Sequence, residues 1–305
     1  MPKILISTTT FGEFDPVPLD LLKKAGINFD LNPHRRKLTG EEVAVLAQGT
    51  AGIIAGTESL SGDVLRQIKN IKVISRCGAG IDNVDLETAR ELGIAVHSTP
   101  YGPTRAVAEL TVGLMLDCLR GISQSDRSIR RGEWQKPMGW LLEGKTVGII
   151  GFGRIGKTVC RLLQPWGVKV IAYDIVPPPD NLGAAIVTFE HLVANSDILT
   201  LHTHASAGCI INPNSIAKMK TGAIVINTSR GNLVDENALY SAVQSGKLAG
   251  AGIDTPPEEP YTGKLRELEN VIITSHIGSY AKEARVLMEK QAVENLLSEL
   301  KAHYA

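Results

Sequence analysis

The sequence predicts an α/β protein made of two doubly wound domains, each built on a parallel β-sheet. Three observations favour this fold class. Short β-type runs alternate with helical patterns along the chain. Most runs in the second half are continuously apolar and β-branched, which is typical of strands covered on both faces. The length of 305 residues also exceeds the usual size of one domain, about 100 to 200 residues.

The first part of the chain repeats a strand and helix pattern. We expect strands at residues 3–7, 51–56, 72–77 and 95–99, because these runs are short and apolar with β-branched residues. Helical patterns lie between them at residues 18–26, 61–68 and 84–93. The repeat predicts βαβ units on one parallel sheet.

A long helical pattern and a second α/β series follow. Residues 104–131 have apolar side chains at helical spacing and no proline, which predicts one long helix that crosses between the domains. Pro100 and Pro103 precede it, so a domain boundary is expected near residue 99. A final amphipathic helix at residues 282–303 is expected to return to the first domain. Further strands are expected at residues 146–151, 168–174, 197–202, 223–229, 250–254 and 270–276.

Composition and charge argue against several classes of function. Thirty-two basic residues balance thirty-two acidic ones, so nucleic acid is not an expected partner. No apolar run approaches the roughly 18 residues that span a bilayer, and the chain does not begin with a signal-peptide pattern. We therefore expect no membrane association and a cytoplasmic location. No C-x-x-C spacing or nearby paired histidines accompany the cysteines, which predicts free thiols and no metal site at Cys77, Cys118, Cys160 and Cys209.

A glycine motif indicates a dinucleotide site in the second domain. Gly151, Gly153 and Gly156 form G-x-G-x-x-G between a predicted strand and a predicted helix, where they permit a tight turn and close approach of a pyrophosphate. Glycine-rich turns are common, but this context makes the motif specific. Asp174 ends the next strand, where a carboxylate accepts hydrogen bonds from ribose hydroxyls and repels a 2′-phosphate. The following IVPPP supplies no cation, so NAD is the expected cofactor.

Three polar residues follow later strands and can serve ketone reduction together. Arg230, Glu259 and His276 come just after predicted strands, at the edge where doubly wound sheets bind ligands. Arg230 can anchor a 2-oxo acid through its fork of donors. His276 can pass a proton to or from the C2 oxygen, and Glu259 can hold the imidazole. Each residue alone also fits an ordinary surface or loop role; the combination after a cofactor motif favours catalysis.

The chain resembles the D-isomer-specific 2-hydroxyacid dehydrogenases, nearest to the short D-3-phosphoglycerate dehydrogenase-like members. The resemblance covers nearly the whole length. It implies a Rossmann NAD domain at residues 99–280, inserted into a smaller flavodoxin-like substrate domain at residues 1–98 plus 281–305. Members usually dimerise through the long helix of the NAD domain, so a homodimer is expected. The segments that carry the resemblance include SRCGAGIDNVD, VGIIGFGRIG, INTSRGNLVDENAL, AGIDTPPEEP and NVIITSHIGS.

The resemblance also implies individual roles. Arg230, Glu259 and His276 match the family's catalytic residues, and Asp254 matches its carboxamide contact. The implied substrate-binding residues are Cys77, Gly78, Ala79, Gly80, Arg230 and His276, the glycine-rich loop holding the carboxylate through backbone amides. The implied cofactor-binding residues are Gly151, Gly153, Arg154, Ile155, Gly156, Asp174, Thr228, Ser229, Arg230, Asp254, His276, Gly278 and Ser279.

The identity of the 2-hydroxy acid stays open at this point. D-3-phosphoglycerate needs cations for its phosphate, but the loop AGTESLSGD offers Glu58 and no cation, and Arg76 and Arg105 are the nearest candidates. Glyoxylate, hydroxypyruvate or another D-2-hydroxy acid suits the same residues. Departures from the family pattern at Thr203, His204, Thr255, Ser275 and Tyr280 affect the substrate pocket or the cofactor edge.

Two other functions remain alternatives. The fold also serves NAD(H)-sensing scaffolds and corepressors, which bind partners without turnover. Hydride abstraction from formate or phosphite uses related pockets. The intact trio favours an enzyme that acts on a 2-hydroxy acid.

Overall fold

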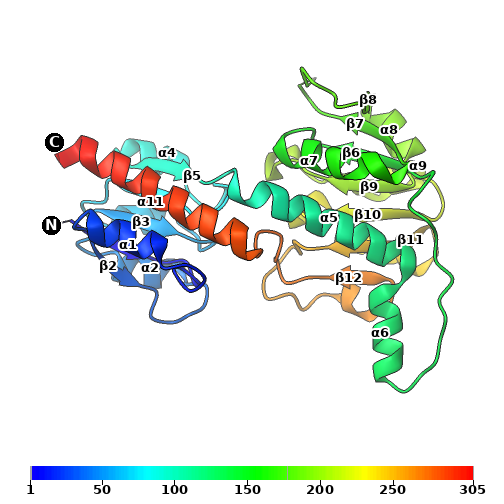
Figure 1. The fold of residues 1–305 in the computed structure, drawn as a ribbon, viewed down its shortest axis with the longest axis horizontal. Helices are drawn as coiled ribbons and strands as arrows, with labels where there is room; N and C mark the ends of the chain where they lie inside the picture. The colour runs from blue at the N-terminus through cyan, green and yellow to red at the C-terminus, as the bar shows by residue number, and fades with distance from the viewer. Residues whose placement is uncertain (1, 177, 305) are drawn as a thin grey trace. The chain divides into compact units, whose positions relative to one another are not determined.

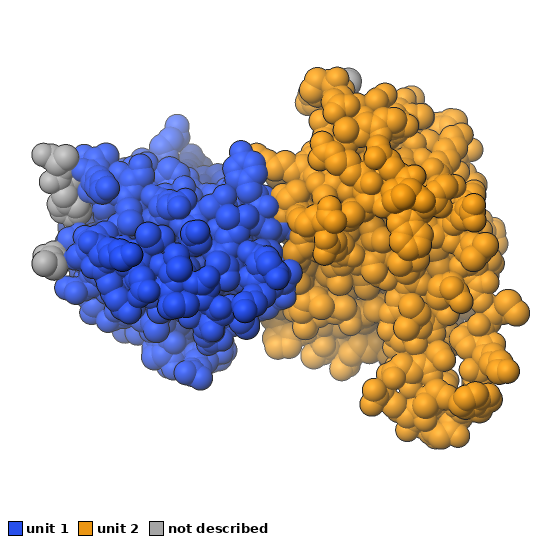
Figure 2. Space-filling view, in the orientation of Figure 1, with its two compact units in different colours: residues 1–103, 279–305 blue, residues 104–278 orange. Residues whose placement is uncertain are grey.

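The computed structural model describes residues 2–176 and 178–304, and Met1, Pro177 and Ala305 lie outside the described residues. The chain divides into two compact units, which Figure 2 colours separately. Unit 1 contains residues 1–103 and 279–305, and unit 2 contains residues 104–278. Each unit has one parallel sheet with apolar clusters of its own. The predicted α/β fold class with two doubly wound sheets is confirmed.

In unit 1, the described residues form a five-stranded parallel sheet in the order β2-β1-β3-β4-β5. This is the flavodoxin-like order, whose switch point lies between the first and third strands. The strands are β1 Lys3–Ile6, β2 Asn28–Leu31, β3 Gly52–Ala55, β4 Val73–Arg76 and β5 Ala95–Ser98. The helices are α1 Val17–Lys24, α2 Gly40–Leu46, α3 Gly62–Gln67, α4 Leu86–Glu91 and α11 Lys282–Tyr304.

In unit 2, the described residues form a seven-stranded parallel sheet in the order β12-β11-β10-β9-β6-β7-β8. The order reverses between β6 and β9, as in Rossmann sheets. The strands are β6 Thr146–Ile150, β7 Lys169–Tyr173, β8 Ala185–Ile186, β9 Ile198–Leu201, β10 Ala223–Asn227, β11 Leu248–Ile253 and β12 Val271–Ile273. The helices are α5 Gly102–Arg120, α6 Ile122–Arg130, α7 Arg154–Leu163, α8 Phe189–Asn195, α9 Pro213–Lys218 and α10 Glu236–Gln244 (Figure 1).

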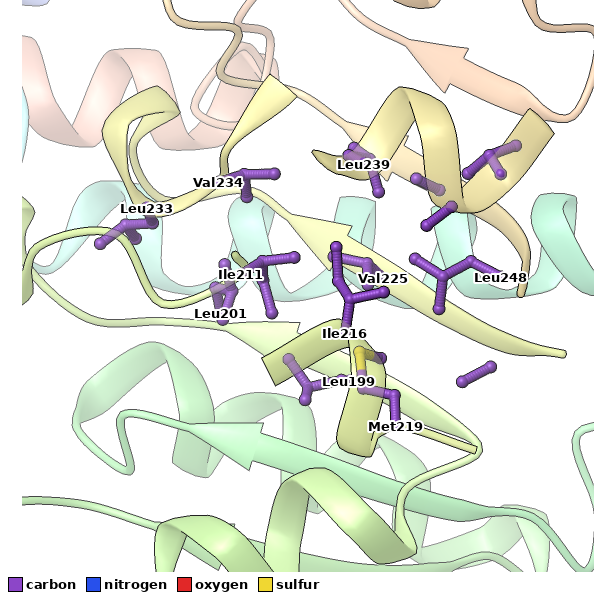
Figure 3. Packing of buried hydrophobic residues seen from close by; sticks show 14 of the residues in the cluster. Leu199, Leu201, Ile211, Ile216, Met219, Val225, Leu233, Val234, Leu239 and Leu248 are labelled. Atoms are coloured by element: carbon purple, nitrogen blue, oxygen red, sulfur yellow. The ribbon is translucent and has the colours of Figure 1, made fainter. Parts of the chain in front are cut away.

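The strands of unit 2 are apolar on both faces because helices cover both. Leu199 and Leu201 pack with α9 and α10 on one face, where Figure 3 shows them beside Ile216 and Val225. Ile198, which precedes Leu199 and so points to the opposite side of the strand, belongs to the cluster on the other face. This double coverage explains why the predicted strands of the second half read as continuous apolar runs.

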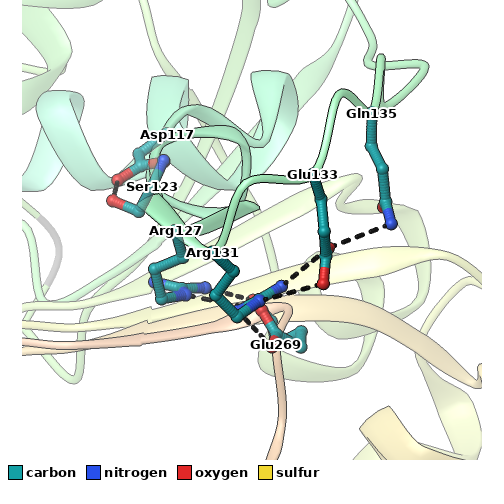
Figure 4. Close-up of polar contacts among 7 residues, drawn as sticks. All are labelled: Asp117, Ser123, Arg127, Arg131, Glu133, Gln135 and Glu269. Atoms are coloured by element: carbon teal, nitrogen blue, oxygen red, sulfur yellow. Dashed lines mark hydrogen bonds and ion pairs between the residues drawn. The ribbon is translucent and has the colours of Figure 1, made fainter. Parts of the chain in front are cut away.

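The single helix predicted for residues 104–131 is wrong. Gly121 adopts a φ of +60°, in the left-handed region, and separates α5 from α6. The carboxylate of Asp117 accepts hydrogen bonds from the backbone N–H and the hydroxyl of Ser123, which fixes the start of α6 (Figure 4). At the other end of α6, the guanidinium of Arg131 donates a hydrogen bond to Oε1 of Glu269 at 3.1 Å. The chain therefore turns at Gly121 instead of continuing straight.

The sequence patterns also missed some short elements. Strand β2, helix α2 and the two-residue strand β8 lie in segments where no element was expected. Strand β2 is an edge strand and mostly exposed, so it lacks the apolar pattern of a buried strand.

The final helix completes the core of unit 1, as predicted. Met288, Val293 and Leu296 of α11 are fully buried and pack with Ile4 and Ile6 of β1. No helix among the described residues is both long and apolar enough to cross a membrane.

Candidate active site

The glycine motif forms the turn between β6 and α7 in unit 2. Gly151 has a φ of +90°, and a Cβ on it would lie 2.4 Å from the backbone oxygen of His202. A Cβ on Gly156 would lie 2.1 Å from the oxygen of Gly151, so the helix packs on the turn only without a side chain there. Apart from its chain neighbours, no described atom lies within 4 Å of the Cβ position on Gly153. The open space beside the helix N-terminus fits a pyrophosphate.

Asp174 follows β7 and is tied to this turn. One carboxylate oxygen accepts a hydrogen bond from the backbone N–H of Phe152 at 2.7 Å, and the other accepts one from Val176 at 3.2 Å. A cavity of about 360 Å³ adjoins it, with Gly151, Asp174 and Cys209 among its lining residues. The carboxylate therefore stands at the rim of a space next to the glycine turn, where an adenosine fits. Pro177 lies outside the described residues; it belongs to the IVPPP segment, which we expected to supply no cation.

His276 and Glu259 form a direct pair in unit 2. Nδ1 of His276 lies 2.6 Å from Oε1 of Glu259, and both side chains are about one third exposed. Because a carboxylate only accepts, Nδ1 donates this bond. His276 has a φ of +56°, which is uncommon for a residue with a side chain and is seen at functional sites. The pair is the arrangement of a proton-transfer residue and its orienting partner.

Asp254 organises the loop that carries His276. Its carboxylate is 1 % exposed and accepts three hydrogen bonds: from the Thr274 hydroxyl at 2.5 Å, the Ile277 N–H at 2.8 Å and the Gly278 N–H at 2.9 Å. Its backbone oxygen accepts from the N–H of His276 at 3.0 Å. A carboxylate has about four lone-pair sites, so one remains for a further donor. Sequence reasoning assigned Asp254 to the cofactor and missed this positioning role and Thr274.

Arg230 follows β10, the neighbour of β11 in the sheet. Its backbone oxygen accepts from Nδ2 of Asn227 at 2.8 Å, and its guanidinium donates to the backbone oxygen of Ser229 at 2.7 Å. The hydroxyl of Thr228 pairs with that of Thr111 on α5 at 3.0 Å, and the Ser229 hydroxyl donates to the oxygen of Leu201. These bonds fix the backbone of the loop after β10.

The three predicted catalytic residues therefore come from adjacent strands. Arg230 follows β10, Glu259 follows β11 and His276 follows β12, and these strands are neighbours in one parallel sheet. A Cβ on Gly231 would lie 2.5 Å from the oxygen of Pro256, so the loops after β10 and β11 touch. Unit 2 holds the three catalytic candidates and all predicted cofactor residues except Ser279, which belongs to unit 1.

His202 is a half-buried histidine to which sequence reasoning assigned no role. It follows β9, and its backbone N–H donates to the oxygen of Ile150 at the end of β6, the two strands of the switch point. Nε2 lies 3.0 Å from the Thr200 hydroxyl, whereas Nδ1 is shielded and has no partner among the described residues. Burial lowers the pKa of His202 from 6.5 to about 3, so the ring is neutral.

The predicted substrate loop, residues 77–80, belongs to unit 1 and follows β4. Gly78 has a φ of +152° and donates its N–H to the Thr99 hydroxyl at 2.7 Å. The Arg76 guanidinium lies over Gly78 and donates to the Cys77 oxygen at 2.9 Å, so a side chain at position 78 would clash with it. Burial raises the pKa of the Cys77 thiol to about 11. The four cysteines are free thiols, and the described residues hold no group of His, Cys, Asp and Glu that suits a metal ion.

Comparisons with known proteins identify the family to which the chain is similar. The family model described as "D-isomer specific 2-hydroxyacid dehydrogenase, NAD binding domain" matches residues 112–278. The chain is 37 % identical to a hydroxypyruvate reductase of Thermotoga maritima, over 92 % of this chain and 96 % of the relative. It is 34 % identical to a D-3-phosphoglycerate dehydrogenase of Archaeoglobus fulgidus, over 92 % of this chain but 54 % of the relative, so it spans about half of that protein.

A solved structure shows the same likeness in three dimensions. The structure of a glyoxylate reductase from Paecilomyes thermophila matches with a TM-score of 0.86 and 30 % identity. The match covers 97 % of this chain and 94 % of the other.

Proposed function

The chain belongs to the D-isomer-specific 2-hydroxyacid dehydrogenase family, a family of NAD-dependent enzymes, and we propose that it transfers hydride at C2 of a D-2-hydroxy acid or 2-oxo acid. One observation carries the proposal: the 2.6 Å bond between Glu259 and His276 lies at the strand edge that also holds Arg230. In this proposal, a proton-transfer residue, its partner and a cation that binds the substrate carboxylate share one edge of the sheet with the turn that binds the dinucleotide.

Each catalytic side chain has a separate task in this proposal. Arg230 binds the substrate carboxylate through its planar fork of donors. In the oxidation direction, His276 takes the proton that leaves the C2 hydroxyl, and Glu259 stabilises the resulting imidazolium through Nδ1. In reduction, Nε2 returns that proton to the C2 oxygen. NAD, when bound, supplies the hydride acceptor at its nicotinamide ring.

We propose that the glycine turn and Asp174 hold the cofactor. The N–H groups of Arg154 and Ile155 begin α7 beside the open space at Gly153 and meet the pyrophosphate. Asp174 accepts from the adenosine ribose, and Asp254 has one lone-pair site left for the carboxamide. The remaining contacts proposed are those of Thr228, Ser229, Gly278 and Ser279, on the loops after β10 and β12.

For the substrate, we propose that the backbone amides of residues 77–80 contact the carboxylate, with residues 99–280 as the NAD domain and the rest as the substrate domain. The left-handed Gly78 lets backbone approach a ligand closely. The relatives act, by their names, on D-3-phosphoglycerate, hydroxypyruvate and glyoxylate. These acids are the candidate substrates.

We further propose a homodimer in the cytoplasm. The segment from α6 to β6 exposes several large apolar side chains, including Trp134 at 81 % and Met138 at 91 %, and such a patch typically marks an interface. Free cysteines suit a reducing compartment. Light scattering should give twice the chain mass of 32.7 kDa, and a monomer would contradict the proposal.

The activity test is NADH oxidation with a panel of 2-oxo acids that includes 3-phosphohydroxypyruvate, hydroxypyruvate and glyoxylate. We expect stereospecific turnover of at least one. In the His276→Ala variant, kcat should fall by about a hundredfold or more while NADH binding changes little. His34→Ala, at an exposed histidine of unit 1, is the matched control. Tight NADH binding without turnover of any acid would instead indicate a sensing scaffold.

A further inference from the structure

Strand β10 ends in a buried asparagine to which the proposed function assigns no role. The strand lies between β9 and β11 in the sheet of unit 2, and its first four residues, Ala223 to Ile226, are apolar and buried. Asn227 follows them and is 0 % exposed. A buried side-chain amide is costly unless its donor and acceptor groups find partners. The partners of this amide therefore show what it does.

The Asn227 side chain holds the segment after β10 at two points. Oδ1 accepts a hydrogen bond from the backbone N–H of Ser229 at 3.0 Å, and Nδ2 donates one to the backbone oxygen of Arg230 at 2.8 Å. The first bond is the contact that asparagine makes in Asx turns. A carboxylate of the same shape could make only the first bond, because it accepts and does not donate. The amide therefore matches both backbone groups.

This bridge also fixes the oxygen that the Arg230 guanidinium binds. The peptide group between Ser229 and Arg230 lies between the two bonds of Asn227, and its oxygen accepts a hydrogen bond from Nη1 of Arg230 at 2.7 Å. The Ser229 hydroxyl donates to the backbone oxygen of Leu201 at 2.8 Å and holds the same segment against the end of β9. Asn227 thus acts on Arg230 through its main chain and through the oxygen that receives its guanidinium.

The sheet makes Asn227 a firm anchor for this loop. Its backbone is paired with Leu201 of β9 on one side and with Ile253 of β11 on the other. Its backbone oxygen also accepts the N–H of Asp254 at 2.9 Å. Because strands hold Asn227 from both sides, the two bonds of its side chain start from a fixed point and carry that fixed position to the loop.

We propose that Asn227 is a positioning residue that orients Arg230 for the carboxylate of the substrate. The proposal rests on the proposed function, in which Arg230 binds that carboxylate. An arginine side chain has many rotamers, and holding it in place before the substrate arrives lowers the entropy cost of binding. A displacement of about 1 Å in a group that positions the substrate can lower a rate about a hundredfold. Without the bridge, Arg230 should bind the substrate less well.

The test is a double-mutant cycle of Asn227→Ala and Arg230→Lys in the full chain. The assay uses NADH and either hydroxypyruvate or glyoxylate, whichever the wild type reduces faster. Asn227→Ala should lower kcat/KM about tenfold or more, mainly through a higher KM for the 2-oxo acid, and should change the Kd for NADH less than about twofold. In the Arg230→Lys background the same change should cost less than about threefold, because lysine has no planar fork for the bridge to orient.

Two results of this cycle would overturn the proposal. Equal losses of kcat/KM in both backgrounds would show that Asn227 acts only on the general structure of the loop, because such a role does not depend on residue 230. A Kd for NADH that rises as much as the KM of the 2-oxo acid would show that the bridge serves the cofactor instead. If the folded wild type binds NADH but reduces no 2-oxo acid, the proposed function itself fails, and the role of Asn227 fails with it.

A second asparagine of unit 2 supplies the control. Nδ2 of Asn270 donates to the backbone oxygen of Ala249 at 2.7 Å, but this residue precedes β12 and so lies at the opposite edge of the parallel sheet. Asn270→Ala should leave kcat/KM unchanged. If Asn227→Ala does not fold, Asn227→Ser decides in the same cycle. Its hydroxyl can accept from the N–H of Ser229, but the bond to Arg230 is lost.

Discussion

Acid should destabilise unit 2 through His202 in a way that a single substitution removes. Burial holds the pKa of His202 at about 3 in the folded chain, against 6.5 in an unfolded one. Below pH 6.5 the unfolded chain binds a proton that the folded chain does not. The free energy of unfolding therefore falls as the pH falls from about 6.5 toward about 3, and is unaffected above that range. Between pH 7.5 and pH 5.0 the loss amounts to about 2 kcal/mol at most.

The replacement His202→Gln should abolish this part of the pH dependence. Its amide can still reach the Thr200 hydroxyl, but it does not titrate. Urea unfolding followed by tryptophan fluorescence suits the measurement, because Trp134, Trp140 and Trp166 all lie in unit 2. The wild type should lose up to about 2 kcal/mol more than the variant between the two pH values. His204→Gln, at an exposed position two residues later, should behave as the wild type. Equal losses in His202→Gln and wild type would refute the reasoning.

Three further predictions concern the candidate site. Asp174→Ala should weaken NADH binding about tenfold or more and should reduce the preference for NADH over NADPH, because the adenosine ribose loses a charged hydrogen-bond acceptor. Unchanged affinities for both cofactors in a fluorescence titration would contradict the assignment. Asp254→Asn should lower the free energy of unfolding by about 1–3 kcal/mol and should also lower kcat. The reason is that an amide nitrogen replaces a carboxylate oxygen that accepts hydrogen bonds from N–H groups of the His276 loop. Urea unfolding and steady-state kinetics would show whether both quantities fall. Cys209 is exposed and lines the cavity beside Asp174. A thiol reagent should therefore modify Cys209 before the other cysteines, and bound NADH should slow this modification. Equal rates of modification with and without NADH would place the cofactor elsewhere. Cys77, whose pKa burial raises to about 11, should resist the reagent until the chain unfolds.

The parts of the fold that were predictable are those with a strong local pattern. Strands such as β9 and β10 are covered on both faces, so their residues are apolar in an unbroken run. Edge strand β2 has one buried face at most, and its NFDL sequence resembles a loop. The break at Gly121 depends on one glycine in a helical pattern, where a glycine is also tolerated inside the helix. Its left-handed φ was not evident from spacing alone.

The candidate site was predictable where chemistry requires particular residue types. The glycines of the turn between β6 and α7 and the carboxylate after β7 have a fixed spacing, so their positions in the fold could be predicted from the sequence. The positioning role of Asp254 depends on three donors that come from the loop after β12, about twenty residues away in the chain. The burial of Glu58 and His202 depends on neighbouring strands as well. No local pattern encodes such contacts, because they exist only once the sheet is assembled.

The last helix has a consequence for synthesis on the ribosome. Helix α11 covers one face of the unit 1 sheet, over Ile4, Ile6 and Ile54, but roughly 180 residues separate it from the end of the first part of that unit. At a synthesis rate of about 5–20 residues per second, that face of the sheet stays uncovered for roughly 10–35 s before α11 is made. Unit 2 is continuous in the chain and can fold during this interval. Nascent chains should therefore need protection of the uncovered sheet, and chaperone capture should be strongest before residue 282 emerges.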